Sequence, residues 1–116
     1  MSEVRQGQVY WLEFGPVVGS VPAERHPCVV VQNDIFNRSA IATSVVCLIT
    51  SNLSLANAPG NVLLKKGEAS LPKASVVNVS QILTVDKAEL VDYSGKLGVA
   101  SAAAVCEGLH LLFDRL

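Results

Sequence analysis

The sequence predicts a mainly β domain with one helix at its C-terminal end. Short β-branched and aromatic runs recur between residues 8 and 97, and turns rich in Gly, Pro, Asn and Ser separate them. Apolar residues repeat at spacings of three and four only in the last stretch, 99–115, which is the periodicity of an amphipathic helix. Short strands followed by one helix favour a small curled antiparallel sheet, or a partly open barrel, with the helix packed on it.

The strands are expected where apolar or alternating runs lie between turn residues. The first run alternates and is rich in aromatic residues, and Gly15 and Pro16 end it. The second begins at Pro27, because proline is tolerated at the first position of a strand, where its missing N–H is not needed. The third run is wholly apolar and is therefore expected to be central. The complete set of expected strands is 7–14, 27–32, 45–49, 61–64, 75–79, 82–85 and 93–97.

Helical segments are expected at three places. Asn33 resembles a helix cap before a short turn at 34–38, and Asp86 resembles a cap before another turn at 86–90. The only long helix, 99–115, contains Gly108, which weakens its middle. The face expected to pack on the sheet consists of Ala102, Val105, Cys106, Leu109, Leu112 and Phe113.

Length and composition fit one globular domain over residues 1–116. A chain of 116 residues has room for a single core, and 50% apolar residues with 16% charged residues can form one. No apolar run is long enough to cross a bilayer, and the first residues lack the basic-then-apolar order of a secretion signal. We therefore expect a cytoplasmic protein with no membrane partner.

The net charge and the positions of the cysteines and histidines limit the kinds of functional site that the chain can form. The net charge of −1 argues against a broad nucleic-acid-binding surface, so any contact with RNA must use a local cluster of cations. The two histidines, His26 and His110, are far apart, and Cys28, Cys47 and Cys106 lack the paired spacing of metal ligands. Each cysteine lies in an apolar run, so we expect buried, reduced thiols and no metal or other cofactor.

Polar side chains gather at the expected strand ends without a close pair of carboxylates, a phosphate-binding glycine loop or a nucleophile elbow. A phosphodiester can be cut by the neighbouring ribose 2′-OH, which needs a proton acceptor, a donor for the leaving oxygen and positive charge on the phosphorane. Arg, His and hydroxyl groups supply these functions if the strand ends converge on one site. The same residue types would also stand at these positions if the side chains were simply solvated at separate strand ends. The set is Ser20, Arg25, His26, Thr50, Ser51, Asn52, Ser80 and Gln81.

Five segments in one order carry a family resemblance. They are GQVYW at 7–11, GS at 19–20, HPCVVVQND at 26–34, ITS at 49–51 and QILTVDK at 81–87. Together with GKL at 95–97 and the helix that follows, this order resembles the MazF/PemK toxins of bacterial toxin–antitoxin pairs over residues 5–116.

The resemblance implies an SH3-like, partly open barrel of the CcdB/PemK kind, assembled as a homodimer. It implies a metal-independent, sequence-specific endoribonuclease that cleaves single-stranded mRNA by 2′-OH attack and leaves 2′,3′-cyclic phosphate and 5′-OH ends. It also implies a cognate antitoxin whose acidic C-terminal tail blocks the site.

The resemblance also implies where catalysis takes place. In that family a catalytic Arg stands directly before the Pro, and a Thr ending the third strand holds the phosphate. Thr50 matches the second position, whereas His26 occupies the first and Arg25 lies one residue upstream. Successive strand residues point to opposite faces, so either a bulge returns Arg25 to the site or His26 itself faces the phosphate.

We expect His26 to act as general base or acid, Arg25 to stabilise the phosphorane, and Thr50 with Ser51 to orient the phosphate. The expected RNA contacts are Ser20, Ser51, Asn78 and Gln81. A stacking surface for bases is expected from Phe36 or Trp11, although the alternation around Trp11 favours a core position.

Two carboxylates of the family pattern are absent. Val21 and Pro22 follow Gly19-Ser20 where the family has an acidic residue, and Ser80 precedes Gln81 where many members have Asp or Glu. Their absence leaves a second hypothesis open, in which the chain is a binding module. It would take an antitoxin-type peptide, by strand addition at a sheet edge, without cutting RNA.

Overall fold

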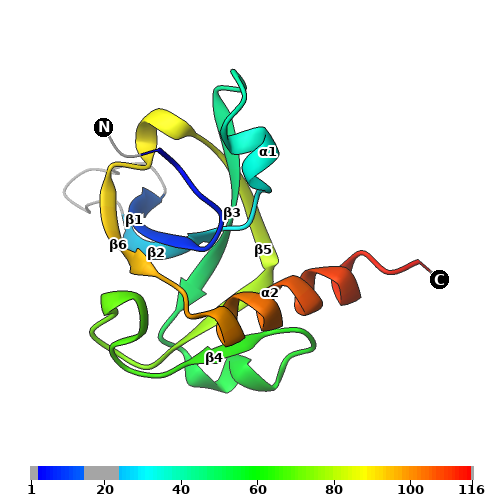
Figure 1. Cartoon of the computed structure of the whole chain (residues 1–116). Helices are drawn as coiled ribbons and strands as arrows, with labels where there is room; N and C mark the ends of the chain where they lie inside the picture. Colours follow the sequence, from blue (N-terminus) through cyan, green and yellow to red (C-terminus); the bar gives the residue numbers. More distant parts are fainter. Residues whose placement is uncertain (1–2, 15–23, 116) are drawn as a thin grey trace.

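The computed structural model describes residues 3–14 and 24–115, and it has one antiparallel sheet that curls into a half-open barrel (Figure 1). The six strands lie in the order β4-β5-β3-β2-β1-β6, so β4 and β6 are the two edges. The prediction of a mainly β domain with a C-terminal helix is confirmed. The strands are β1 (Gln8–Phe14), β2 (Glu24–Val30), β3 (Thr43–Thr50), β4 (Val62–Leu64), β5 (Ser75–Asp86) and β6 (Asp92–Lys96).

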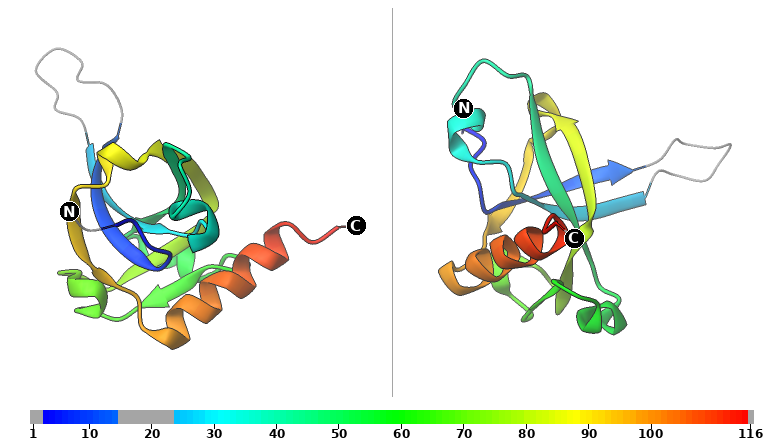
Figure 2. Two further views of the ribbon diagram at one scale, coloured as in Figure 1. Left: turned by 45° about the horizontal axis from the view of Figure 1, so that its top comes forward. Right: turned by 90° about the vertical axis from the view of Figure 1, so that its right-hand side faces the viewer.

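Helical segments fill the connections and cover one side of the sheet. The helices are α1 (Asp34–Asn37) and α2 (Val99–Leu112), and the 3₁₀ turns are η1 (Leu53–Asn57), η2 (Glu68–Ser70) and η3 (Lys87–Glu89). The two views of Figure 2 place α2 across the sheet near β4 and the lower part of β5. Within the described residues, no helix combines the length and the apolar character that crossing a membrane requires.

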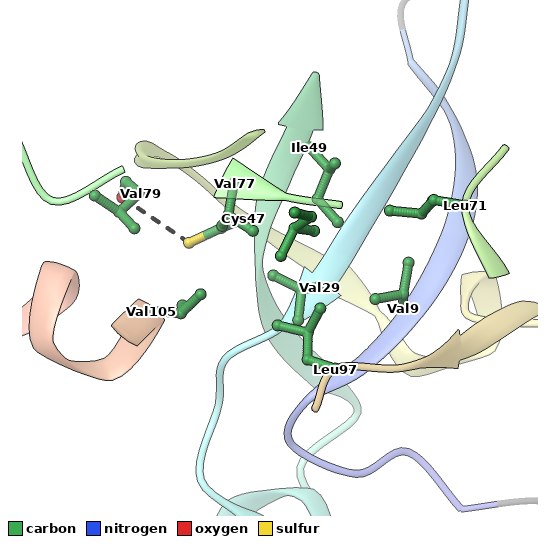
Figure 3. Close-up of a cluster of buried hydrophobic side chains, with 10 residues drawn as sticks. Val9, Val29, Cys47, Ile49, Leu71, Val77, Val79, Leu97 and Val105 are labelled. Carbon is green, nitrogen blue, oxygen red and sulfur yellow. Dashed lines mark hydrogen bonds between the residues drawn. The ribbon is translucent and has the colours of Figure 1, made fainter. Parts of the chain in front are cut away.

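Strand alternation divides the buried side chains between the two faces of the sheet. One cluster includes Val9, Val29 and Cys47 and lies under α2, which contributes Val105 (Figure 3). The opposite cluster includes Tyr10 and Cys28, the sequence neighbours of Val9 and Val29. Both faces are therefore apolar in the middle of the sheet, apart from the polar residues at the register shift of β5.

Two strands differ from the sequence-based boundaries. β2 begins at Glu24 rather than at Pro27, because the β1–β2 pairing continues as far as Phe14 opposite Glu24. Pro27 is tolerated inside β2 because the β2–β3 pairing covers only residues 28–30. The two strands expected at 75–79 and 82–85 are one strand, β5, with a register shift opposite Cys47 and Leu48 that accommodates Ser80 and Gln81.

The C-terminal helix ends earlier than its periodicity predicts, and the packed face is narrower. Val105 is buried, but Leu112 and Phe113 are 42% and 73% exposed, and Cys106 is exposed too. The expectation of three buried thiols is therefore wrong for Cys106, because the buried side of α2 is that of Val105 and Gly108, and Cys106 lies outside it. Cys28 is buried, and this desolvation raises its thiol pKa to about 12.

Candidate functional site

The beginning of β2 places Arg25 and His26 beside a cavity of about 260 Å³. Its apolar lining comes from several strands and the η2 region and includes the buried residues Pro27, Ile49 and Leu71. Its polar lining consists of Arg25, His26, Ser51, Lys73 and Ser75. Residues from β2, from the end of β3 and from the start of β5 thus converge on one hollow, as the strand-end hypothesis requires.

Arg25 is held by two partners on strands beyond its own. Its Nη2 atom contacts Oδ2 of Asp92, the first residue of β6. Its guanidinium carbon lies 5.2 Å from the centre of the Trp11 ring, within the range of a cation–π interaction. The Arg25 side chain remains about half exposed, so part of the guanidinium faces solvent.

His26 is paired with a carboxylate on its own strand. Its Nε2 atom is 2.9 Å from Oε2 of Glu24, and both residues lie on the same side of β2 because they are two positions apart. Arg25 and His26 each have a carboxylate partner, although neither partner stands at the two positions where the family pattern has an acidic residue. Glu24 is local, whereas Asp92 reaches Arg25 only because β1 lies between β2 and β6 in the sheet.

Strand alternation alone would separate Arg25 from His26, yet both side chains line the cavity. β2 is paired here with β1 alone, so it forms the rim of the sheet at this level. Long side chains at such a rim reach a common hollow from either face, and no bulge within residues 24–30 is needed.

Thr50 is the last residue of β3 and is half-buried, but it does not line this cavity. Its Oγ1 accepts a hydrogen bond from the backbone N–H of Asn52 at 3.1 Å. Cys28 pairs with Leu48, and continuing that register by two residues puts His26 and Thr50 on one face of the sheet. Ser51, the next residue, does reach the cavity.

Two of the expected RNA contacts lie away from the cavity. Asn78 opposes Leu48 near the register shift of β5 and accepts a hydrogen bond from Ser80 Oγ at 3.1 Å. Gln81 is exposed at the same irregularity, and neither residue is part of the cavity lining. The structure thus brings together Arg25, His26 and Ser51, while Ser20 lies outside the described residues.

Sequence reasoning missed Lys73 and Ser75, and it favoured a core position for Trp11 over a stacking surface. A detectable pattern was present in the sequence, because Lys73 stands two residues before the run at 75–79, just as Arg25 stands two residues before the run that begins at Pro27. Trp11 packs against the core but also lines the cavity. Phe36 is 51% exposed and lies in a different hollow, between α1 and the end of α2.

A larger hollow of about 660 Å³ adjoins the first and shares Trp11 and Arg25 with it. Three carboxylates, those of Glu13, Glu89 and Asp92, belong to its lining. Arg25 lies at both hollows, His26 and Lys73 line only the smaller one, and the three carboxylates line only the larger one. A phosphate is favoured in the smaller cavity, where Arg supplies a planar fork of donors and Lys a mobile positive charge.

Comparison with known proteins defines the class of protein. The model of the family of PemK-like, MazF-like toxins of type II toxin–antitoxin systems matches residues 5–113. The chain is 40% identical over 111 residues to endoribonuclease MazF6 of Mycobacterium tuberculosis, which covers 96% of this chain and 97% of the relative. It is 37% identical over 89 residues to endoribonuclease EndoA of Bacillus subtilis, covering 77% and 76% of the two chains. The chain belongs to this toxin family, and the resemblance drawn from its motifs is confirmed.

Solved structures of the family share the fold. An endoribonuclease in complex with its cognate antitoxin from a mycobacterial species superposes with a TM-score of 0.79 at 24% identity, covering 97% of this chain and 98% of that one. MazF from Deinococcus radiodurans superposes with a TM-score of 0.74 at 22% identity, covering 99% and 100% of the two chains. The half-open barrel with its terminal helix is therefore the architecture of this family.

Proposed function

We propose that this chain is the toxin of a type II toxin–antitoxin pair and acts as an endoribonuclease on single-stranded mRNA. The observation that carries the proposal is the cavity in which Arg25, His26 and Lys73 meet the hydroxyls of Ser51 and Ser75. Family membership supports the same activity, because relatives at 37–40% identity are named endoribonucleases.

The reaction we propose is attack of a ribose 2′-OH on the adjacent phosphorus, without a metal ion. His26 exchanges a proton with the reacting oxygens as general base or acid, and Glu24 at 2.9 Å orients its ring. Arg25 stabilises the charge that develops on the phosphorane, and Lys73 adds a second positive charge to the same cavity. The bond from phosphorus to the 5′ oxygen breaks, so the products carry a 2′,3′-cyclic phosphate and a 5′-OH.

The remaining polar residues orient the strand. Ser51 donates to a phosphate oxygen inside the cavity, and Thr50 supports it from the end of β3. Asn78 and Gln81 contact bases farther along the RNA, since both lie on β5, which begins at the cavity with Ser75. Ser20 is a further proposed RNA contact.

The partners we propose follow from the charge of the cavity. A cognate antitoxin inserts carboxylates of an acidic C-terminal tail between Arg25, His26 and Lys73, and so excludes the phosphate. Support comes from a mycobacterial relative of the same fold that was solved with its cognate antitoxin. We also propose a cytoplasmic homodimer. Phe113 and Leu111 are exposed, and a second subunit that covers such apolar side chains would stabilise a domain of 116 residues.

The test uses the two histidines of the chain as a matched pair. Purified protein is incubated with a single-stranded RNA of mixed sequence in the presence of a metal chelator, and product ends are analysed. We expect fragments with 5′-OH and 2′,3′-cyclic phosphate ends. The variant His26→Ala should lower the rate by about a hundred- to ten-thousand-fold, because it removes the proton-transfer group. His110→Ala is the control, since His110 is exposed on α2, and it should cleave as fast as wild type.

The binding-module hypothesis predicts a different result. RNA would stay intact at high protein concentration, and expression without an antitoxin would not arrest growth. An acidic peptide would still bind, and Arg25→Ala with Lys73→Ala would weaken that binding. Equal activity of His26→Ala and wild type would also contradict the proposed mechanism.

A further inference from the structure

The Arg25 side chain crosses a neighbouring strand to reach its partner. In the sheet, β1 separates β2 from β6, and Trp11 of β1 pairs with Pro27 on one side and Asp92 on the other. Arg25 starts on β2, lies with its guanidinium 5.2 Å from the Trp11 ring centre, and contacts Asp92 on β6. Glu13 lies directly opposite Arg25 in the β1–β2 ladder, yet the ion pair is made with Asp92.

Two contacts of different kinds fix two different degrees of freedom. The face of the Trp11 ring restricts the plane of the guanidinium, and the Asp92 carboxylate restricts its rotation within that plane. Arg25 is thereby kept at the boundary that the 260 Å³ and 660 Å³ hollows share. A long side chain that is half exposed would otherwise sample many rotamers.

The ion pair leaves Arg25 able to bind an anion. A guanidinium has five N–H donors, and the contact with Asp92 engages Nη2 alone. The remaining donors are available to a phosphate in the cavity lined by His26 and Lys73. Asp92 lines the larger hollow and is absent from the lining of the smaller one, so its carboxylate lies outside the cavity in which the phosphate is proposed to bind.

We propose that Asp92, acting with Trp11, is a positioning residue that holds the Arg25 guanidinium at the rim of the cavity for the transition state. This inference rests on the proposed ribonuclease function. Strand alternation directs Arg25 and His26 to opposite faces of β2. Asp92 and Trp11 are the residues that keep the Arg25 guanidinium at the cavity beside His26.

The kinetic test compares Asp92→Asn, Asp92→Glu and Glu13→Gln. Removing the Asp92 charge should lower kcat about tenfold while KM changes little, because the guanidinium loses its geometry rather than its charge. Asp92→Glu should recover much of the rate. Glu13→Gln removes the charge of the residue directly opposite Arg25 in the ladder, which makes no ion pair with it, and should leave kcat unchanged.

A double-variant cycle separates positioning from a general structural role. In an Arg25→Ala background, Asp92→Asn should have no further effect on kcat, since Asp92 acts through Arg25. A full tenfold drop in that background would overturn the proposal. A higher kcat in Asp92→Asn would also overturn it, because it would mean that Asp92 competes with the phosphate for Arg25. An equal decrease of kcat in Glu13→Gln would overturn it too.

A measurement without RNA keeps the inference separate from the proposed function. The ¹⁵N relaxation of the Arg25 Nε–H group should show a rigid side chain in wild type. In Asp92→Asn its order parameter should fall below about 0.6, and in Glu13→Gln it should not change. If wild type cuts no RNA but this contrast holds, the proposed function fails and the positioning stands. Equal mobility of Arg25 in wild type and Asp92→Asn overturns the positioning.

Discussion

Gly108 in the middle of α2 lies directly against Gly60 in the turn before β4. A Cβ atom on Gly108 would be 2.1 Å from the Gly60 carbonyl oxygen, which is far inside van der Waals contact. A glycine inside a helix costs about 1 kcal/mol relative to alanine, yet here it allows the backbone of α2 to approach the loop. The residue that weakens the helix in isolation is therefore the one that lets it dock.

The variant Gly108→Ala should destabilise the protein despite its higher helix propensity. The new methyl group meets backbone atoms that cannot rotate away, so α2 must move off the sheet. We expect a loss of about 2–4 kcal/mol in the free energy of unfolding, measured by urea denaturation. Glu107→Ala, at the exposed neighbouring position, should change it by less than about 0.5 kcal/mol. A Gly108→Ala protein as stable as wild type would contradict the close approach.

Asp34 at the start of α1 should make stability depend on pH. Desolvation alone would raise the pKa of Asp34, but hydrogen bonds from the Gln6 N–H at 2.7 Å and the Asn37 side chain at 3.1 Å, with the Arg5 and Arg38 charges, lower it. A carboxyl with a lowered folded-state pKa stabilises the protein above its unfolded pKa near 3.8, and this contribution disappears as the pH falls through the folded pKa.

The variant Asp34→Asn tests that sign. Wild type should unfold at a higher urea concentration than the variant at neutral pH, and the two midpoints should converge as the pH falls below about 4. The difference should be modest, because the carboxylate is partly exposed to water. Midpoints that diverge further on acidification would show that the pKa of Asp34 is raised rather than lowered.

The three thiols should differ in reactivity. Burial raises the pKa of Cys28 to about 12 and that of Cys47 to about 11, so neither forms much thiolate near neutral pH, whereas Cys106 is exposed. A thiol reagent should modify Cys106 at least about a hundredfold faster than the other two in the native protein. Cys106→Ser should remove the fast phase, and concentrated denaturant should expose the remaining thiols. A second fast thiol in the native state would contradict the burial.

Lys73 should contribute to RNA affinity through its charge. The variant Lys73→Met should weaken binding of a single-stranded RNA and lower the slope of log affinity against log salt by about 0.7, the value for one phosphate contact. Lys66→Met is the control, because Lys66 is also exposed but lies outside the cavity. Binding is measured at several salt concentrations by fluorescence anisotropy. Equal slopes for the two variants would remove Lys73 from the proposed phosphate site.

The backbone architecture was largely predictable, because local patterns encode it. The alternation around Val9 and the apolar run that contains Cys47 predict strands with buried faces, and both residues belong to the core. The spacing around Val105 predicts the docked helix, although its last turn extends past the sheet. The start of β2 was not predictable from Pro27 alone, since the β1 partner extends the strand to Glu24.

The site was predictable only in part. Arg25, His26 and Ser51 were expected to meet and do line one cavity, whereas Thr50 lies beside it and Asn78 and Gln81 lie elsewhere on β5. Their proposed roles await the experiments above. Neither Lys73 nor Asp92 was expected beside Arg25, because nothing in the local sequence gives the order of strands in the sheet.

By itself, the sequence determined the fold class, since hydrophobic periodicity and turn chemistry act over a few residues at a time, and its motifs carried the resemblance to the family. Tertiary structure alone decided that a carboxylate 67 positions away holds Arg25 and that Lys73 enters the same hollow. The physical reason is that strand order and register arise from the packing of the whole sheet, and the reach of a long side chain depends on which strand lies next to it.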